Sequence, residues 1–145
     1  MQFVKDVTFT KGKTEATIES TDIKVASGVI HRVNIVFPSG CAGLVSVSIF
    51  DGAHPIAPST QGQYYRGDDE IVEFNEFIEI KTGPRILTIK GFNEDDTFDH
   101  KIQIRLFILP KRFVLPAAST EGILAGLKQL VLRPIIIREE VVGGE

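Results

Sequence analysis

The residues best able to do chemistry lie together near two-thirds of the chain, in the stretch FNEDDTFDH from 92 to 100. Four carboxylates occur there within six positions, and His100 follows them directly. Calcium is usually bound by carboxylate and carbonyl oxygens supplied by one loop. The stretch therefore contains a candidate calcium site, whose ligands would be Asn93, Glu94, Asp95, Asp96 and Asp99.

The spacing of these carboxylates favours a turn over a metal site. An EF-hand loop has oxygens at alternate positions and a glycine at the sixth, whereas Glu94, Asp95 and Asp96 are consecutive. Asn and Asp side chains bond readily to nearby backbone groups and favour turns. We therefore interpret residues 93–99 as an exposed polar loop that precedes a long strand, and we predict no metal or cofactor, with calcium as the alternative.

The histidines and the cysteine do not form a recognisable site in the sequence. His31, His54 and His100 are the three histidines, Cys41 is the single cysteine, and no internal disulfide is possible. Zinc needs three or four nitrogen or sulfur ligands, and the His-x-His pair of metal-binding cupin barrels is absent. We predict that Cys41 is structural, and that His31 and His100 lie at a sheet rim, bonded to backbone or to a carboxylate.

Other catalytic motifs are missing from the sequence as well. There is no phosphate-binding Gly-loop, no GxSxG elbow and no Cys-x-x-Cys pair, so we predict that the protein is not an enzyme. Sugar-binding sandwiches usually stack a sugar ring on an exposed aromatic side chain. Tyr64 and Tyr65 are the one candidate platform of this kind, in a long middle loop at 51–69. An alternative function is therefore a carbohydrate- or surface-binding module that uses this loop.

The composition is that of one folded domain. The chain has 145 residues, 43% of them hydrophobic and 24% charged, with a formal net charge of -3. This charge gives no basic field for nucleic acid. The apolar runs are far shorter than the ~20 residues of a membrane helix, and the first residues do not resemble a secretory signal. We therefore expect neither nucleic acid nor a membrane as a partner.

The elements that must position these residues alternate between apolar and polar side chains, which is typical of strands. In the stretch from 28 to 37, we expect Val29, His31 and Val33 to share one face, opposite Ile30 and Arg32. Seven or eight such strands separated by turns indicate an all-β fold, an antiparallel β-sandwich of jelly-roll type. The predicted strands cover 3–9, 14–20, 28–37, 44–50, a possible edge strand at 63–66, an extended stretch at 70–81 (which alternates well over 77–81), 85–92 and 100–109.

The pattern changes after Pro110. We predict a β-sandwich domain at 1–110 and a C-terminal arm at 111–145, made of a linker, one short helix and a strand-like tail. The apolar side chains of the arm would form a large exposed patch on a free monomer, so we expect them to contact neighbouring subunits. The alternative is a last helix and strand that close the same domain. The expected contact residues are Phe113, Leu115, Ile123, Leu127, Leu130, Ile135 and Ile137.

Part of the sequence resembles small uncharacterised virion structural proteins of tailed phages and prophages. The resemblance covers about 30–109 and rests on the FPSGCAGL stretch from Phe37 to Leu44, HPIAP from His54 to Pro58, the GDD triplet at 67–69, and the acidic turn and strand from Asn93 to Arg105. It implies a non-enzymatic capsid decoration or auxiliary protein, located in the virion and in the host cytoplasm during assembly. Together with the missing catalytic motifs and the apolar arm, it leads us to expect symmetric homo-oligomers such as trimers, with other virion proteins such as a major capsid protein as further partners.

Overall fold

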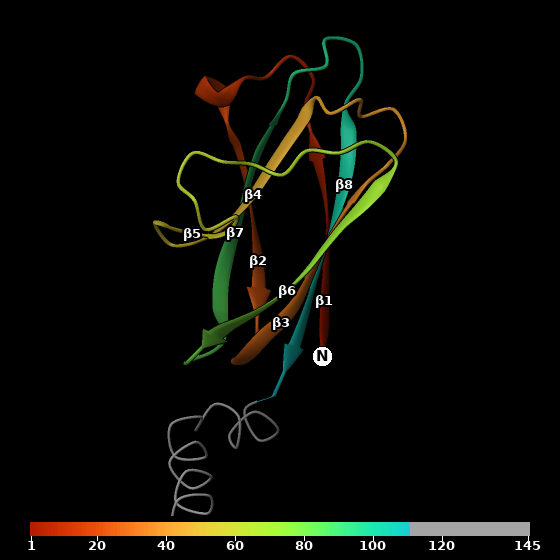
Figure 1. Cartoon of the computed structure of the whole chain (residues 1–145). Coiled ribbons are helices and arrows are strands. Elements are labelled where there is room, and N and C mark those ends of the chain that lie inside the picture. Colours follow the sequence, from red (N-terminus) through yellow and green to blue (C-terminus); the bar gives the residue numbers. More distant parts are fainter. Residues whose placement is uncertain (111–145) are drawn as a thin grey trace, which may run out of the picture. The chain divides into compact units, whose positions relative to one another are not determined.

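The computed structural model describes residues 1–110, which contain eight β-strands and one short 3-10 helix (Figure 1). No helix among these residues is long and apolar enough to cross a membrane. The predicted contact residues and short helix of the arm lie outside the described residues. In chain order, the elements are β1 (Gln2–Phe9), η1 (Glu15–Thr17), β2 (Glu19–Val25), β3 (Gly28–Phe37), β4 (Val45–Asp51), β5 (His54–Ala57), β6 (Glu70–Ile80), β7 (Arg85–Asn93) and β8 (His100–Leu109).

The strands form two four-stranded antiparallel sheets with the strand order of a jelly roll. The first sheet has the order β1-β8-β3-β6, and the second has the order β2-β7-β4-β5. Consecutive strands mostly alternate between the two sheets, so each sheet is assembled from segments that are distant in the sequence. The predicted fold class, an antiparallel β-sandwich of jelly-roll type, is confirmed for the described residues.

The core lies between the sheets and is built mainly from valine, leucine and isoleucine. β8 shows the pattern most clearly, because Ile102, Ile104, Leu106 and Ile108 are at most 1% exposed while the residues between them face outward. Alternate side chains of a strand point to the same face, so the sequence of β8 dictates which face is buried. Burial of each such side chain contributes roughly 1.5–3 kcal/mol.

The prediction for the two faces of β3 is wrong at His31. The pairing register of β3 shifts between Ile30 and Arg32, and this bulge changes the phase of the side chains by one residue. As a result, Ile30 is fully buried together with Val33, whereas His31 packs the edge of its ring against Phe107, 6.3 Å between ring centroids. The sequence pattern does not reveal the bulge, because both phases place apolar residues inward.

The predicted strand at 14–20 is also wrong. This stretch begins with the 3-10 helix η1, and β2 starts only at Glu19. The Thr17 hydroxyl oxygen accepts a bond from the Thr14 backbone N–H (2.9 Å), and the Thr17 backbone N–H donates to the Thr14 carbonyl (2.8 Å). Such local bonds of threonine compete with strand pairing, and here they close a turn instead.

The predicted loop at 51–69 contains the short strand β5, which includes His54 and pairs with β4. The edge strand expected at 63–66 is reduced to one bridge, between Tyr65 and Val47. Their backbone groups bond in both directions, at 2.8 and 3.0 Å. The 51–69 loop is therefore attached to β4 at two points.

Replacing Gly91 should destabilise the sandwich, because this glycine lies where β7 passes very close to its neighbours. A Cβ at this position would overlap the carbonyl oxygen of Ser46 and lie 2.8 Å from the Phe9 ring. We expect Gly91→Ala to lower the free energy of unfolding by roughly 1–3 kcal/mol, measured by urea denaturation. The exposed Ser20→Ala on the adjacent β2 is the control, for which we expect a change within about 0.5 kcal/mol. Equal midpoints for the two variants would contradict this account.

Candidate functional site

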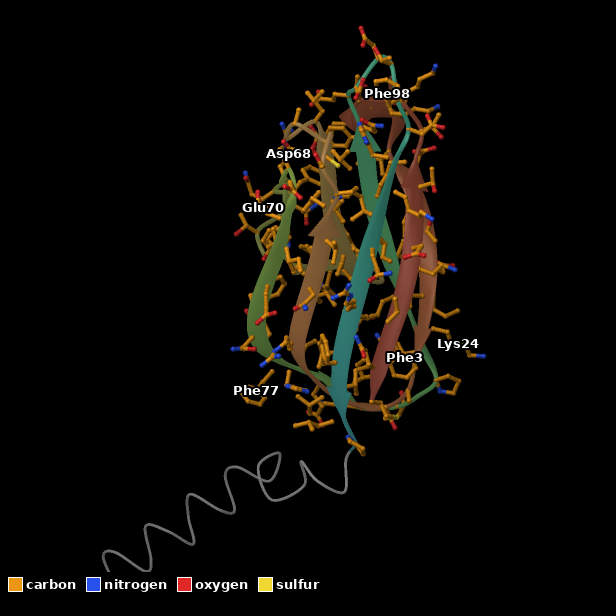
Figure 2. The ribbon with its side chains drawn as sticks, turned by 90° about the vertical axis from the view of Figure 1, so that its right-hand side faces the viewer. Phe3, Lys24, Asp68, Glu70, Phe77 and Phe98 are labelled. Atoms are coloured by element: carbon orange, nitrogen blue, oxygen red, sulfur yellow. The ribbon has the colours of Figure 1, made fainter. Side chains whose placement is uncertain are left out.

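The chemistry-bearing residues gather at one end of the sandwich, which we call the loop end. It consists of residues 10–14, 38–44, 66–69 and 94–99, the segments that join strands at this end. Figure 2 shows Asp68, Glu70 and Phe98 there, and Phe3, Lys24 and Phe77 at the opposite end. The acidic stretch and Cys41 are thereby brought close together in space.

Asp95 organises the acidic loop through both of its carboxylate oxygens. Oδ1 accepts bonds from the backbone N–H groups of Thr97 (2.8 Å) and Phe98 (3.3 Å), and Oδ2 lies 2.8 Å from His100 Nε2. The Thr97 N–H, followed by His100, holds the pKa of Asp95 below its ordinary value. This carboxylate therefore serves to close the turn.

Asn93 is fully buried beneath the same loop, and its side-chain amide is bonded at both atoms. Its Nδ2 donates to the carbonyls of Phe9 (3.2 Å) and Phe98 (2.8 Å), and its Oδ1 accepts from the Asp95 backbone N–H (3.0 Å). Asn93 thus joins the end of β1 to the acidic loop. A buried amide with these bonds is a structural link between two chain segments.

His100 begins β8 and is 8% exposed. Its bond to Asp95 confirms the prediction that this histidine lies at a sheet rim and bonds to a carboxylate. The Asp95 partner could not be identified from the sequence, because four residues separate it from His100 and four nearby carboxylates were possible. Both side chains are only about one-tenth exposed, so the pair is largely shielded from water.

The other carboxylates of the loop end hold separate loops together. Asp99 accepts a bond from the Lys11 N–H (2.9 Å), and Asp68 accepts one from the Gly40 N–H (2.9 Å). Glu94 lies 3.7 Å from the Arg66 guanidinium in a partly exposed ion pair. The acidic residues at this end thus accept hydrogen bonds from backbone N–H groups, or pair with a cation, and so fix the positions of the loops.

The five candidate calcium ligands do not share one centre in this arrangement. Asn93 and Asp95 bond to each other, but Glu94 and Asp99 bond to different loops, and Asp96 accepts from the Thr97 hydroxyl (2.9 Å). Among residues 1–110, no group of three or more His, Cys, Asp or Glu side chains is placed to hold a metal ion. The geometry supports a turn in which each acid has its own donor.

Cys41 is fully buried in the 38–44 loop. Burial raises the pKa of its thiol, and the charges of Asp68 and Asp95 raise it further. A reactive cysteine needs the opposite, a lowered pKa that provides thiolate at neutral pH. Cys41 is therefore a buried structural thiol, as predicted, and its raised pKa does not suit a nucleophile. This holds even though Asp95 and His100 lie at the same end of the sandwich.

Tyr64 and Tyr65 are placed in two different environments. The Tyr65 ring stacks on Phe74, 5.2 Å between centroids, and packs against the core. The Tyr64 ring meets Phe92 edge-on at 5.2 Å, and its hydroxyl donates to Glu15 (3.1 Å). Burial is the main cause of the raised pKa of both hydroxyls. The two rings do not form one shared platform, and Tyr64 is the one on the outside of the sandwich.

A surface that we had not singled out from the sequence runs across the outer face of the first sheet. Gln103 bonds to Asp6 (2.9 Å) and to Arg105 (2.6 Å), and Arg32 bonds to Asn75 (3.4 Å). This polar network is bordered on β6 by Phe77, which is 78% exposed. The alternation of Ile71, Glu73, Asn75, Phe77 and Glu79 along β6 is the sequence signal that could have indicated this face.

Comparisons with known proteins give a structural likeness but no family. No protein-family model matches the chain, and no match is found among curated proteins. Among solved structures, a chain of the cyanophage Pam1 capsid asymmetric unit is similar, with a TM-score of 0.45 and 14% sequence identity. The match covers 76% of this chain and 84% of that chain.

The bond between Asp95 and its donors should make stability depend on pH in the acid range. Because the pKa of Asp95 is lowered in the folded state, its charged form stabilises the fold above its ordinary pKa of 3.8, and this contribution is lost as pH falls through the lowered value. We expect Asp95→Asn to lower the melting temperature at neutral pH, and the gap from the wild type to narrow as pH falls below about 4.

Asp96→Asn is the matched control for this experiment, because Asp96 is exposed and bonds to the neighbouring Thr97 hydroxyl. Its melting temperature should follow that of the wild type at every pH. A constant gap between Asp95→Asn and the wild type from pH 7 to pH 2.5, roughly the range in which carboxylates titrate, would show that the Asp95 charge does not stabilise the loop.

Proposed function

We propose that the protein is a non-enzymatic structural protein of a viral particle, of the capsid decoration or auxiliary type, which acts through homo-oligomeric assembly. The observation that carries the proposal is that residues 1–109 fill every position of an eight-stranded jelly roll. All eight strands contribute side chains to its core. The apolar residues that follow in the sequence would then be additional to this sandwich, and the surface of another subunit is a natural place to bury them.

The viral assignment is supported by the fold and by the sequence resemblance together. Jelly rolls occur in viral capsid domains, lectins and cupins, so the fold alone does not select a function. The resemblance to virion proteins over about 30–109 favours the first of these classes. The commitment of Asp95, His100 and Asn93 to loop geometry supports a role without catalysis.

The assembly would divide the chain into a rigid module, residues 1–110, and an arm, residues 111–145. The arm would bind neighbouring copies of the same chain, giving symmetric oligomers such as trimers, and the assembled particle would include other virion proteins such as a major capsid protein. The residues proposed to make the contacts between subunits are Phe113, Leu115, Ile123, Leu127, Leu130, Ile135 and Ile137.

Removing the arm should abolish oligomer formation. We expect the full chain to have an oligomeric mass in light scattering, and a variant that ends at Pro110 to have the mass of a monomer, because the arm supplies the contacts. Circular dichroism checks that the shortened chain keeps its β-structure, as expected from a core built within residues 1–109. A full chain that is already monomeric, or a mass that is unchanged by the truncation, would refute the proposed assembly.

A carbohydrate- or surface-binding role for the 51–69 loop is the second candidate. It is favoured by the position of Tyr64 and Arg66, which both lie against Phe92, with ring centroids 5.2 Å apart and the guanidinium 6.0 Å from the Phe92 centroid. An aromatic face beside a cation can hold a sugar ring that carries a negative charge.

A glycan array tests this second candidate. We expect Tyr64→Ala to lose any binding that the wild type shows, because the stacking ring is removed, and Tyr64→Phe to retain it. The hydroxyl of Tyr64 bonds to Glu15, so the phenylalanine variant separates the ring from that bond. No binding by the wild-type protein, or equal binding by both variants, would exclude Tyr64 as a sugar platform.

A further inference from the structure

The edge strand β6 is the most exposed strand of the sandwich. It lies at the end of the first sheet and, among the described strands, pairs with β3. Its 11 residues make it longer than the other three edge strands, which have 8, 7 and 4 residues. The unpaired backbone groups of such an edge are a template for an added strand.

The side chains of β6 give this edge a single sign of charge. Glu70, Glu73, Glu76 and Glu79 are all exposed, and no lysine or arginine occurs within the strand. Phe77 lies between Glu76 and Glu79 in the sequence, and its side chain is 78% exposed (Figure 2). Within residues 1–110, no ion pair is formed by Glu76 or Glu79. An aromatic anchor thus lies between two carboxylates that have no cationic partner in the described part of the chain.

This charge pattern disfavours the simplest way of covering the edge. If β6 paired with β6 of a second copy, the two strands would bring eight glutamates together without a lysine or arginine from either strand, and like charges close together across a strand pair are destabilising. The edge therefore disfavours a second copy of β6 and favours a strand that carries apolar side chains and cations. Proteins commonly protect sheet edges with charge in this way.

We propose that β6 receives residues 133–138 from the C-terminal arm of a second copy, added as a strand at the sheet edge. This inference rests on the proposed function and names the surface that the arm binds. The segment reads Arg-Pro-Ile-Ile-Ile-Arg, three β-branched residues with an arginine at each end. Its isoleucines suit an edge that exposes Phe77, its arginines suit the glutamates of that edge, and isoleucine is favoured in strands.

The charges of the two partners are also complementary over a longer range. Residues 1–110 contain 15 carboxylates and 11 lysines and arginines, whereas the arm at 111–145 contains five lysines and arginines and four carboxylates, three of which follow Arg138. Opposite charge steers association and fixes register. Because the arm of one copy would bind a different surface on the next copy, the contact is of the head-to-tail kind, which closes into a ring such as a trimer when the rotation permits.

Charge reversal on each partner tests this contact in the full-length protein. We expect Glu76→Lys with Glu79→Lys, and separately Arg133→Glu with Arg138→Glu, to weaken self-association by about tenfold or more, because like charges then oppose each other. A 1:1 mixture of the two double variants should regain association between unlike copies, since each arm then meets an edge of opposite charge. A ring with an odd number of copies keeps one mismatched contact in this mixture, and the chain that carries all four reversals should restore the full oligomeric mass. Masses are measured by light scattering at low salt, where exposed charges are least screened.

A control pair of substitutions and a second test variant separate this result from a loss of folding or a general effect of charge. Asp22→Lys with Asp96→Lys makes the same change of charge away from β6 and should leave the mass unchanged. Phe77→Ser removes the aromatic anchor without changing the charge and should also weaken association. Circular dichroism confirms that each variant is folded.

The remaining outcomes distinguish this inference from the proposed function. A wild-type oligomer that is unaffected by the reversals would overturn the β6 contact but leave assembly through the arm intact. The β6 contact would also be overturned if both double variants lost mass and neither their mixture nor the chain with all four reversals regained association. Residues 133–138 would then act within their own chain or at another surface. A monomeric wild type would refute the proposed assembly itself.

Discussion

The position of β8 between β1 and β3 is the constraint on which the rest of the sandwich depends. β8 pairs with both neighbours along nearly its whole length, and four of its inward side chains are buried in the core. The first sheet therefore cannot form until the last of its strands is present, although β1 and β3 precede it by many residues. The strict alternation of β8 fixes its register, because a shift by one residue would turn its isoleucines toward water.

Much of the fold could be predicted from the sequence where one face of a strand is clearly apolar. β7 and β8 were predicted nearly to their ends, since Leu87 and Ile89, and then Ile102 to Ile108, alternate with polar residues. β3 was located, but not its bulge, because Ile30 and Val29 are both apolar and fit either phase. The turn at Thr14 and the short strand β5 depend on individual hydrogen bonds, which periodicity does not encode.

The candidate site was predicted in part for the same reason. Residue types and spacing predicted that the acidic stretch is a loop next to a strand, and that His100 bonds at a sheet rim. Which carboxylate His100 meets, and which distant N–H groups donate to Asp68 and Asp99, depends on how loops distant in sequence are brought together. In the sequence, Phe77 is one apolar residue of an alternating strand. Its exposure follows from the position of β6 at a sheet edge, which the sequence pattern does not give.

A consequence of the β1–β8 pairing concerns mechanical force. Met1 and Ile108 exchange two backbone hydrogen bonds of 2.7 Å, so the first residue and the end of β8 lie side by side in antiparallel strands. Tension between the N-terminus and residue 109 would therefore load these bonds one after another, as in the opening of a zipper, and not all at once in shear. A particle that pulled on the sandwich through both ends would begin to unravel it at modest force.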